Sequence, residues 1–262
     1  ACAEGEEIPY FKEFWIMKPA ADAKDITVYA LMDSPSLAGA YRFVITPGAP
    51  TVMDVQCALF AREGGRNFEK IGLAPLTSMF FYGEEKNGRP GDHRPEVHNS
   101  DGLLIENGKD WTWMPLDNPK RLSVTSFPMN SPRGFGLLQR DGDFKSYHDL
   151  AARYEKRPSL WVKPEGDWGN GSLNLVKIPT EDEMHDNIVA FWSPSKPLSE
   201  AKEGQPAQEL PYPSMMQYRW KLFWMLPDVA LHDLGTATST RVSQSGDTMT
   251  FHVDFEGGML ST

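Results

Sequence analysis

The stretch DITVYALMDSPSLAGAYRFVITPGAPTVMDVQCALF, residues 25–60, decides the fold class. It contains three segments rich in β-branched and aromatic residues, which favour strands. Asp33-Ser34-Pro35 and Pro47-Gly48 separate these segments, and such residues form turns. Strands with a turn about every ten residues are typical of an all-β sandwich or barrel. Strands and helices do not alternate in the manner of a Rossmann fold, so the prediction is a mainly β protein.

The rest of the chain continues this pattern. One helix is predicted at residues 146–156 (SYHDLAARYEK), with Ser146 as its N-cap and Pro158 beyond its end. Further strands are predicted at residues 111–113, 121–127, 134–140, 172–178, 188–192, 218–224 and 248–255.

A change of composition predicts a domain boundary. Residues 195–213 are rich in Pro, Ser, Glu, Gln and Gly, which is typical of a linker between domains. The prediction is therefore one large β domain in residues 1–194 and the beginning of a second in residues 214–262. About fifty residues are few for an independent sandwich, so the second domain is expected to be partial.

Charge and motif content exclude several classes of function. The chain has 26 basic and 36 acidic residues, a net charge of −10, which argues against nucleic-acid or anionic-membrane binding. Its longest apolar runs are far shorter than the roughly 20 residues of a membrane span. It contains no HExxH, paired CxxC or GxSxG motif, so neither a metal, a cofactor nor a serine nucleophile is expected. Paired carboxylates remain, and these suit glycoside hydrolysis.

Two polar stretches are candidates for a site. Residues 94–101 (RPEVHNSD) place an arginine, a histidine and several acid or amide groups directly before an apolar run. A buried strand could not satisfy them all, so they indicate a loop that lines a site, with a solvated surface loop as the alternative. Residues 180–187 (TEDEMHDN) lead into an apolar strand, where a carboxylic acid can be partly desolvated. A solvated turn is the alternative there.

The tryptophans suggest a ligand class. Several of the eight lie beside Gly, Pro or Asp, where an exposed aromatic ring can stack on a sugar. A single tryptophan is more simply a core residue. As a group interleaved with Asp, Glu, Asn and Arg, they favour a carbohydrate cleft.

Several longer motifs follow one another along nearly the whole chain: PYFKEFW (9–15), YALMDSP (29–35), GAYRF (39–43), APLTSMF (74–80), RPEVH (94–98), GFGLLQR (134–140), RYEKRPS (153–159) and DNIVAFW (186–192). In this order they resemble the osmoregulated periplasmic glucan biosynthesis proteins (OpgG and OpgD, formerly MdoG). The resemblance implies a large carbohydrate-active, mutarotase-like β-sandwich, followed by the start of an immunoglobulin-like β-sandwich domain. It also implies a periplasmic protein without a membrane span whose partner is linear or branched β-1,2-glucan; a homodimer is compatible with it.

The resemblance also implies a reaction, because family members are inverting endo-β-1,2-glucanases. The general acid corresponds to Asp186, while Glu183 and Tyr154 match positions that line the site and its proton relay. The family's base is an Asp that here is replaced by Asn99, and an amide cannot take a proton at neutral pH. Asp101 is the alternative base if the loop redirects its carboxylate.

Two functions therefore stay open, an endo-β-1,2-glucanase weakened at its base and a non-catalytic glucan-binding or assembly factor. Whether the chain is an enzyme is left undecided. Met114 replaces an arginine usual in the family, which is expected to weaken a polar subsite or a salt bridge. The predicted substrate-binding residues are Arg94, His98, Trp111, Trp113, Arg153 and Trp192.

Overall fold

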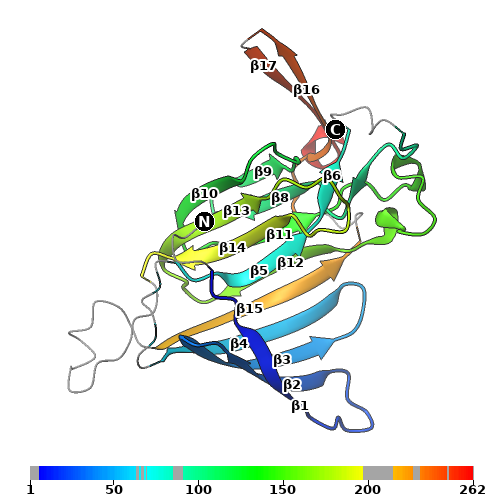
Figure 1. Cartoon of the computed structure of the whole chain (residues 1–262). Helices are drawn as coiled ribbons and strands as arrows, with labels where there is room; N and C mark the ends of the chain where they lie inside the picture. Colours follow the sequence, from blue (N-terminus) through cyan, green and yellow to red (C-terminus); the bar gives the residue numbers. More distant parts are fainter. Residues whose placement is uncertain are drawn as a thin grey trace.

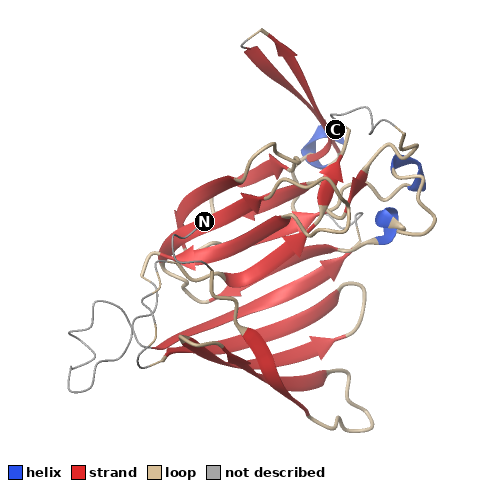
Figure 2. Cartoon of the chain, viewed as in Figure 1, coloured by secondary structure: helices blue, strands red, loops and turns tan. Residues whose placement is uncertain are grey.

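Strands dominate the structure, a computed structural model that describes residues 6–62, 65, 68, 70–84, 91–196, 215–226, 231–246 and 248–261. Within these residues the helical content is confined to three short 3-10 helices (Figure 2). All strand pairs are antiparallel, as the short, turn-separated segments of the sequence predict. The prediction of a mainly β protein is confirmed.

Two large sheets form the body of the molecule (Figure 1). In sheet order the nine-stranded sheet consists of β1 (Tyr10–Ile16), β2 (Ile26–Asp33), β3 (Leu37–Thr46), β4 (Thr51–Ala61), β15 (Met215–Met225), β12 (Ser159–Glu165), β11 (Gly134–Leu138), β8 (Gly102–Glu106) and β9 (Trp111–Pro115). The four-stranded sheet consists of β10 (Ser123–Asn130), β13 (Asn170–Lys177), β14 (Ile188–Pro194) and β5 (Leu73–Ser78). A small third sheet pairs β6 (Phe80–Tyr82) with β7 (Val97–His98).

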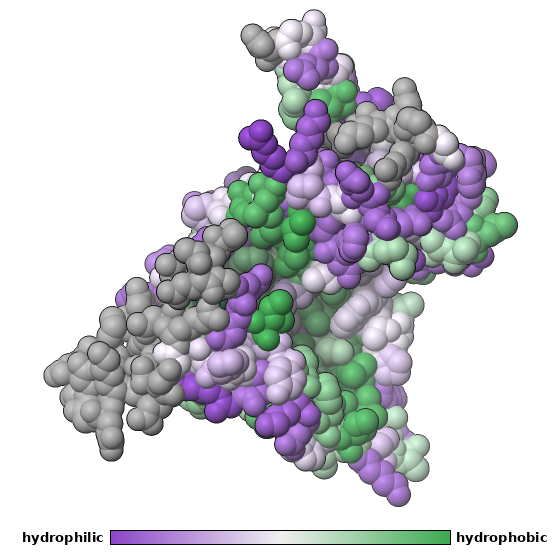
Figure 3. Space-filling view, viewed as in Figure 1, coloured by the Kyte–Doolittle hydropathy of each residue, from purple (hydrophilic) through white to green (hydrophobic). Residues whose placement is uncertain are grey.

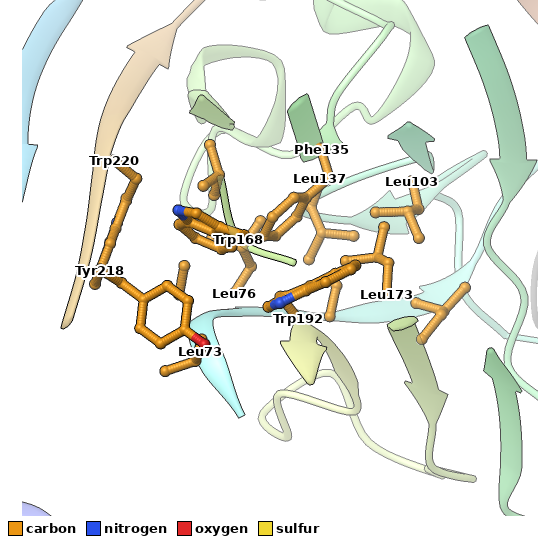
Figure 4. Packing of buried hydrophobic residues seen from close by; sticks show 14 of the residues in the cluster. Leu73, Leu76, Leu103, Phe135, Leu137, Trp168, Leu173, Trp192, Tyr218 and Trp220 are labelled. Carbon is orange, nitrogen blue, oxygen red and sulfur yellow. The ribbon is translucent and has the colours of Figure 1, made fainter. Parts of the chain in front are cut away.

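The main core lies between the two large sheets. Leu173 and Trp192 of the four-stranded sheet pack in one cluster with Phe135 of the nine-stranded sheet, and all three are fully buried. Trp168, between β12 and β13, enters the same cluster with its ring centroid 5.8 Å from that of Trp220 (Figure 4). Burying such a side chain stabilises the fold by about 1.5–3 kcal/mol. Two face-to-face sheets around one core confirm the β-sandwich.

The four-stranded sheet covers only part of its larger partner. All seven residues of β1, the edge strand, are exposed, including Phe14 and Trp15. Hydrophobic surface is accordingly visible over the strands at this end of the nine-stranded sheet (Figure 3).

Strand β15 lies in the large sheet, although the sequence predicted that a second domain begins at residue 214; the division into two domains stays a prediction. The strand pairs along its length with β4 on one side and β12 on the other, so it lies in the middle of the nine-stranded sheet. The Pro- and Ser-rich composition before it indicated a change of domain, but strand pairing depends on distant partners that composition does not reveal. The linker prediction falls mostly on residues 197–214, which lie outside the described residues.

The region after β15 contains a separate hairpin. Strands β16 (Thr236–Ser245) and β17 (Thr248–Glu256) pair only with each other among the described strands and project away from the sandwich (Figure 1). A short 3-10 helix, η3 (Gly258–Ser261), follows. The assignment of this region to an immunoglobulin-like domain stays a prediction.

The predicted helix at residues 146–156 is wrong. The segment instead contributes to two 3-10 helices, η1 (Phe144–Ser146) and η2 (Tyr154–Lys156), and Asp143 rather than Ser146 caps the first. The Asp149 carboxylate accepts the backbone N–H groups of Ala151 and Ala152, a local hydrogen-bonding pattern that competes with a helix. His148 and Arg153 have φ of +51°, which is incompatible with a continuous right-handed helix.

None of the helices among the described residues has the length and apolar composition needed to cross a membrane.

Candidate functional site

Three connections meet at one end of the sandwich: residues 91–101, residues 139–158 between β11 and β12, and residues 178–187 between β13 and β14. Side-chain contacts between them, described below, hold them together. The two 3-10 helices of the second connection mark this end in Figure 2, and hydrophilic residues predominate there in Figure 3.

Arg94 joins the three connections. Its guanidinium donates to Asp149 Oδ2 at 2.9 Å and to Glu183 Oε2 at 2.7 Å, one acceptor from each of the other two connections. It also donates to both carboxylate oxygens of Asp92, with Nη2 2.7 Å from Oδ2. The planar guanidinium suits such multiple pairing, which fixes orientation as well as charge. One arginine therefore organises three carboxylates at the mouth of the site.

The pKa values of these groups reflect the pairing. Hydrogen bonding to Arg94 lowers the pKa of Asp92 against the opposing effect of burial. Backbone N–H groups, chiefly that of Ala152, together with Arg94 lower the pKa of Asp149. Both carboxylates consequently remain ionised well below neutral pH.

A second pair of contacts continues the wall. The Tyr154 hydroxyl donates to Glu183 Oε2 at 3.1 Å, the same oxygen that accepts from Arg94. Burial, and then the neighbouring Glu183 carboxylate, raises the pKa of Tyr154 to about 12, so the phenol keeps its proton at neutral pH. Arg157 lies over the Tyr154 ring at 4.6 Å and donates to Asn99 Oδ1 at 2.6 Å. Tyr154, Glu183, Arg157 and Asn99 thus form one connected polar cluster, in which Tyr154 is buried and the other three are partly exposed.

A layer of buried polar groups supports the first connection from below. His98 is fully buried, with Nδ1 2.9 Å from Gln139 Oε1 and Nε2 2.8 Å from Glu96 Oε2. Asp101 accepts the Arg140 backbone N–H at 2.6 Å and lies 3.4 Å from its guanidinium.

Burial opposes ionisation of both His98 and Asp101, but mutual attraction outweighs it. The pKa of His98 is raised chiefly by the Asp101 and Glu96 carboxylates, while His98 and Arg140 lower the pKa of Asp101. The candidate ligand atoms of Glu96, His98 and Asp101 lie within 4.8 Å of one another, as a metal site requires. Both imidazole nitrogens are already hydrogen-bonded, however, and Arg140 supplies positive charge at this place. The cluster fits an internal ion network better than a metal centre.

A pocket of about 760 Å³ opens beside Arg94. This volume lies in the range of about 300–1,000 Å³ that is typical of ligand pockets. Charged and polar groups predominate among the side chains that line it. The lining residues are Gly91, Asp92, His93, Arg94, His148, Asp149, Leu150 and Ala151.

Comparison with known proteins identifies the family. The sequence model described as "Periplasmic glucan biosynthesis protein, MdoG" matches residues 1–262. The chain belongs to the MdoG family. "Glucans biosynthesis protein G" of Ralstonia nicotianae is 47% identical over the whole chain, which covers 51% of that protein. The protein of the same name from Pseudomonas paraeruginosa is 48% identical over 89% of the chain and 42% of its own length. The chain thus spans about half the length of the curated relatives it matches.

Among solved structures, a GH36 α-galactosidase from Geobacillus stearothermophilus in complex with raffinose matches with a TM-score of 0.39 and 10% identity. The match covers 85% of the chain and 29% of that structure.

Family membership confirms the resemblance seen in the sequence motifs, and the structure brings four of the predicted site residues together: Arg94, Asn99, Tyr154 and Glu183. Asp186, the predicted acid, lies three residues after Glu183 in the same connection and is exposed. Its position leaves the carboxyl group open to solvent and to a ligand.

Other predicted residues do not fit their roles in this MdoG-family structure. Asp101 is buried and accepts a hydrogen bond from Arg140, so it is unsuited to activating a water beside a bound ligand. His98 and Trp192 are fully buried, and neither presents a face to a sugar. Trp192 is a core residue because its strand lies in the four-stranded sheet with its ring directed into the sandwich (Figure 4).

The remaining three predicted binding residues, Trp111, Trp113 and Arg153, contact other protein side chains rather than Arg94. Trp111 stacks on Trp161 and meets the ring of His232 edge-on at 4.8 Å, so both partners cover it. Arg140 lies over the Trp113 ring at 5.4 Å. Arg153 is partly exposed and paired with Glu155 at 2.7 Å.

Sequence reasoning missed several residues of this MdoG-family site. Asp92 precedes Arg94 by two residues, a spacing that a close Asp–Arg pair in a turn could have suggested. Arg157 stands inside the RYEKRPS motif, but its contact with Asn99 spans 58 residues of sequence. The pairing of Asp149 with Arg94 likewise spans 55 residues and has no local signal.

Proposed function

We propose that the chain is a periplasmic protein of glucan biosynthesis that binds β-1,2-glucan against the polar surface around Arg94, Asn99 and Glu183. The observation that carries the proposal is the junction of three separate connections at Arg94. A sugar presents many hydroxyl groups, and fixed charged and amide groups can donate to and accept from them. Membership of a family described by periplasmic glucan biosynthesis supports both the ligand class and the compartment.

The same surface supports hydrolysis of the glucanase type. Asp186 is an exposed carboxyl group that would protonate the glycosidic oxygen as the bond to the anomeric carbon breaks. The hydrogen bond from Tyr154 fixes Glu183, which precedes Asp186 by three residues in the same connection. In an inverting reaction a base takes a proton from the water that attacks the anomeric carbon.

The position of the base favours weak turnover. Asn99 carries an amide in place of the carboxylate, and its oxygen already accepts from Arg157 at 2.6 Å. An amide can orient a water but does not take its proton. Asp101 is buried and held by Arg140, so it does not supply the missing base. The chain is therefore proposed as a glucanase-type protein with impaired hydrolysis, and a purely glucan-binding or assembly factor is the second candidate.

Reducing-end release from linear β-1,2-glucan separates the two candidates. The Asn99→Asp variant restores a carboxylate beside Arg157, which keeps it ionised at neutral pH but also limits its basicity. A general base contributes about 10²–10⁴-fold, so we expect turnover to rise at least about tenfold. Adding Asp186→Asn to that variant should remove the gain.

Binding, measured separately by titration calorimetry, keeps the test decisive. If Asn99→Asp releases no more reducing ends than the parent while both proteins bind the glucan, the chain is a binding factor. If neither protein binds the glucan, the proposed ligand is wrong. The homodimer stays a prediction that light scattering can test.

A further inference from the structure

The segment before and within the C-terminal hairpin contacts the body of the protein at two places. His232 packs edge-on against Trp111 of β9. At the start of the hairpin, Glu84 Oε2 accepts from the Ser239 hydroxyl at 2.9 Å and from the Thr240 backbone N–H at 3.0 Å. These two hydrogen bonds span 155 and 156 residues of sequence, so Glu84 ties distant segments together.

Glu84 also belongs to the buried network beneath the candidate site. Its Oε2 lies 4.0 Å from Arg140 Nη2, and Arg140 in turn holds Asp101. The Asp101 carboxylate is 3.5 Å from His98 Nε2, and His98 directly precedes Asn99. A continuous set of contacts therefore leads from the hairpin to the residue at the predicted base position.

A neighbouring residue extends this network to Tyr154 in the second connection. Gln139, next to Arg140, donates to the backbone carbonyl of His98 at 3.1 Å and to that of Tyr154 at 3.5 Å. Tyr154 contacts Glu183 in the third connection. Residues 139–140 thus connect Glu84, and through it the hairpin, to residues 94–101 and to Tyr154.

Glu84 is one of several carboxylates that surround the positive charges of Arg140 and His98. The carboxylates facing Arg140 and His98 come from Glu84, Glu96, Asp101 and Asp141. Arg140 and Asp101 are largely buried, and charges interact more strongly there than in water. Glu84 is the member that also accepts hydrogen bonds from the hairpin, and only 24% of its side chain is exposed.

We propose that Glu84 is a positioning residue: it docks the hairpin at Ser239 and Thr240 and, through Arg140 and Asp101, holds residues 94–101 in the arrangement that binds glucan. The ligand part of this inference rests on the proposed function. The docking part rests only on the contacts of Glu84. Linkage requires the coupling to act in both directions, so glucan binding also strengthens hairpin docking.

Hydrogen exchange tests the docking directly, because the Thr240 amide is itself a donor to Glu84. In Glu84→Ala, this amide should exchange about tenfold faster, as expected for loss of a charge-assisted hydrogen bond. Amides in residues 94–101 should also lose protection. Glu84→Gln keeps the size of the side chain and one acceptor oxygen, so it should recover part of the protection.

The matched control is Asp254→Asn, which removes a carboxylate from the exposed Arg241–Asp254 pair on the same hairpin. It should leave residues 94–101 unchanged. Unchanged Thr240 exchange in Glu84→Ala would overturn the docking, and unchanged protection of residues 94–101 would overturn the positioning.

Glucan titration tests the coupling. Glu84→Ala should weaken binding of linear β-1,2-glucan about fivefold, within the usual range of coupling between sites, while Asp254→Asn binds as the parent does. Saturating glucan should slow Thr240 exchange in the parent protein but not in Glu84→Ala. Equal affinity of parent and Glu84→Ala overturns the coupling. If the parent binds no glucan, the proposed function fails, whereas the exchange of residues 94–101 still decides the inference about Glu84.

Discussion

Replacing Arg94 with methionine should destabilise the protein and weaken glucan binding together. The Arg94 side chain is 15% exposed and pairs with the carboxylates of Asp92, Asp149 and Glu183. Removing one partner of a fully buried ion pair costs about 3–5 kcal/mol, whereas exposed pairs contribute about 0.2–1 kcal/mol. For this partly buried group we expect a loss of about 2–3 kcal/mol, equivalent to a fall in Tm of about 5–10 °C.

Urea denaturation at pH 7 measures the free energy of unfolding, with Arg241→Met as the control. Arg241 also pairs with one aspartate, but both side chains are about half exposed, and its replacement should cost less than about 1 kcal/mol. If the two substitutions cost the same, Arg94 does not organise the three connections.

The pH dependence of the Arg94 effect has a definite sign. The folded-state pKa values of Asp92 and Asp149 are lowered, so their stabilising contribution is present above the unfolded value of about 3.9 and is lost as pH falls through the folded values. The difference in stability between parent and Arg94→Met should therefore stay constant from pH 5 to 8 and shrink below about pH 4. A difference that shrinks instead between pH 5 and 8 would contradict this assignment.

Three further predictions concern neighbouring groups. Tyr154→Phe removes the hydroxyl that donates to Glu183, so it should lower stability by about 1 kcal/mol and reduce glucan affinity, as calorimetry can show; unchanged affinity would separate Tyr154 from the ligand. Burial, with the carboxylates around it, raises the pKa of Asp141 to about 7, so the contribution of this group to stability falls as pH rises from about 4 to 7. The stability of Asp141→Asn relative to the parent should therefore be about 2 kcal/mol higher at pH 8 than at pH 5. An equal difference at the two pH values would argue against the raised pKa of Asp141. Gly134→Ala would place a methyl group 2.0 Å from the Trp161 ring, which should lower the free energy of unfolding by about 1–3 kcal/mol, as urea denaturation can measure. A cost near zero would mean that β11 and β12 move apart easily at this position.

Local sequence predicted most of the strands because their signals are local. Residues 25–32 and 51–60 combine β-branched residues with flanking turns, and they correspond to β2 and β4. The helix at residues 146–156 failed because the side chain of Asp149 satisfies backbone groups that a helix would have used. The place of β15 in the nine-stranded sheet was not predicted, because it depends on β4 and β12, which both lie more than fifty residues earlier in the sequence.

The candidate site was only partly predictable. The charge density of residues 94–101 marked a polar wall, but four of these residues, Glu96, His98, Ser100 and Asp101, prove to be buried support rather than ligand contacts. Trp192 was misassigned because a turn-proximal tryptophan and a core tryptophan look alike in sequence, and only the pairing of β14 directs its ring inward. Contacts such as Arg94 with Glu183, 89 residues apart, become visible only in three dimensions.

A crystal structure of the protein with a linear β-1,2-glucan oligosaccharide would show directly where the sugar binds. We expect sugar density along the surface formed by Arg94, Asn99 and Glu183, with Asp186 facing the chain. Density at the opposite end of the sandwich, in the second pocket beside Asn107 and Arg133, with the Arg94 surface empty, would contradict this expectation.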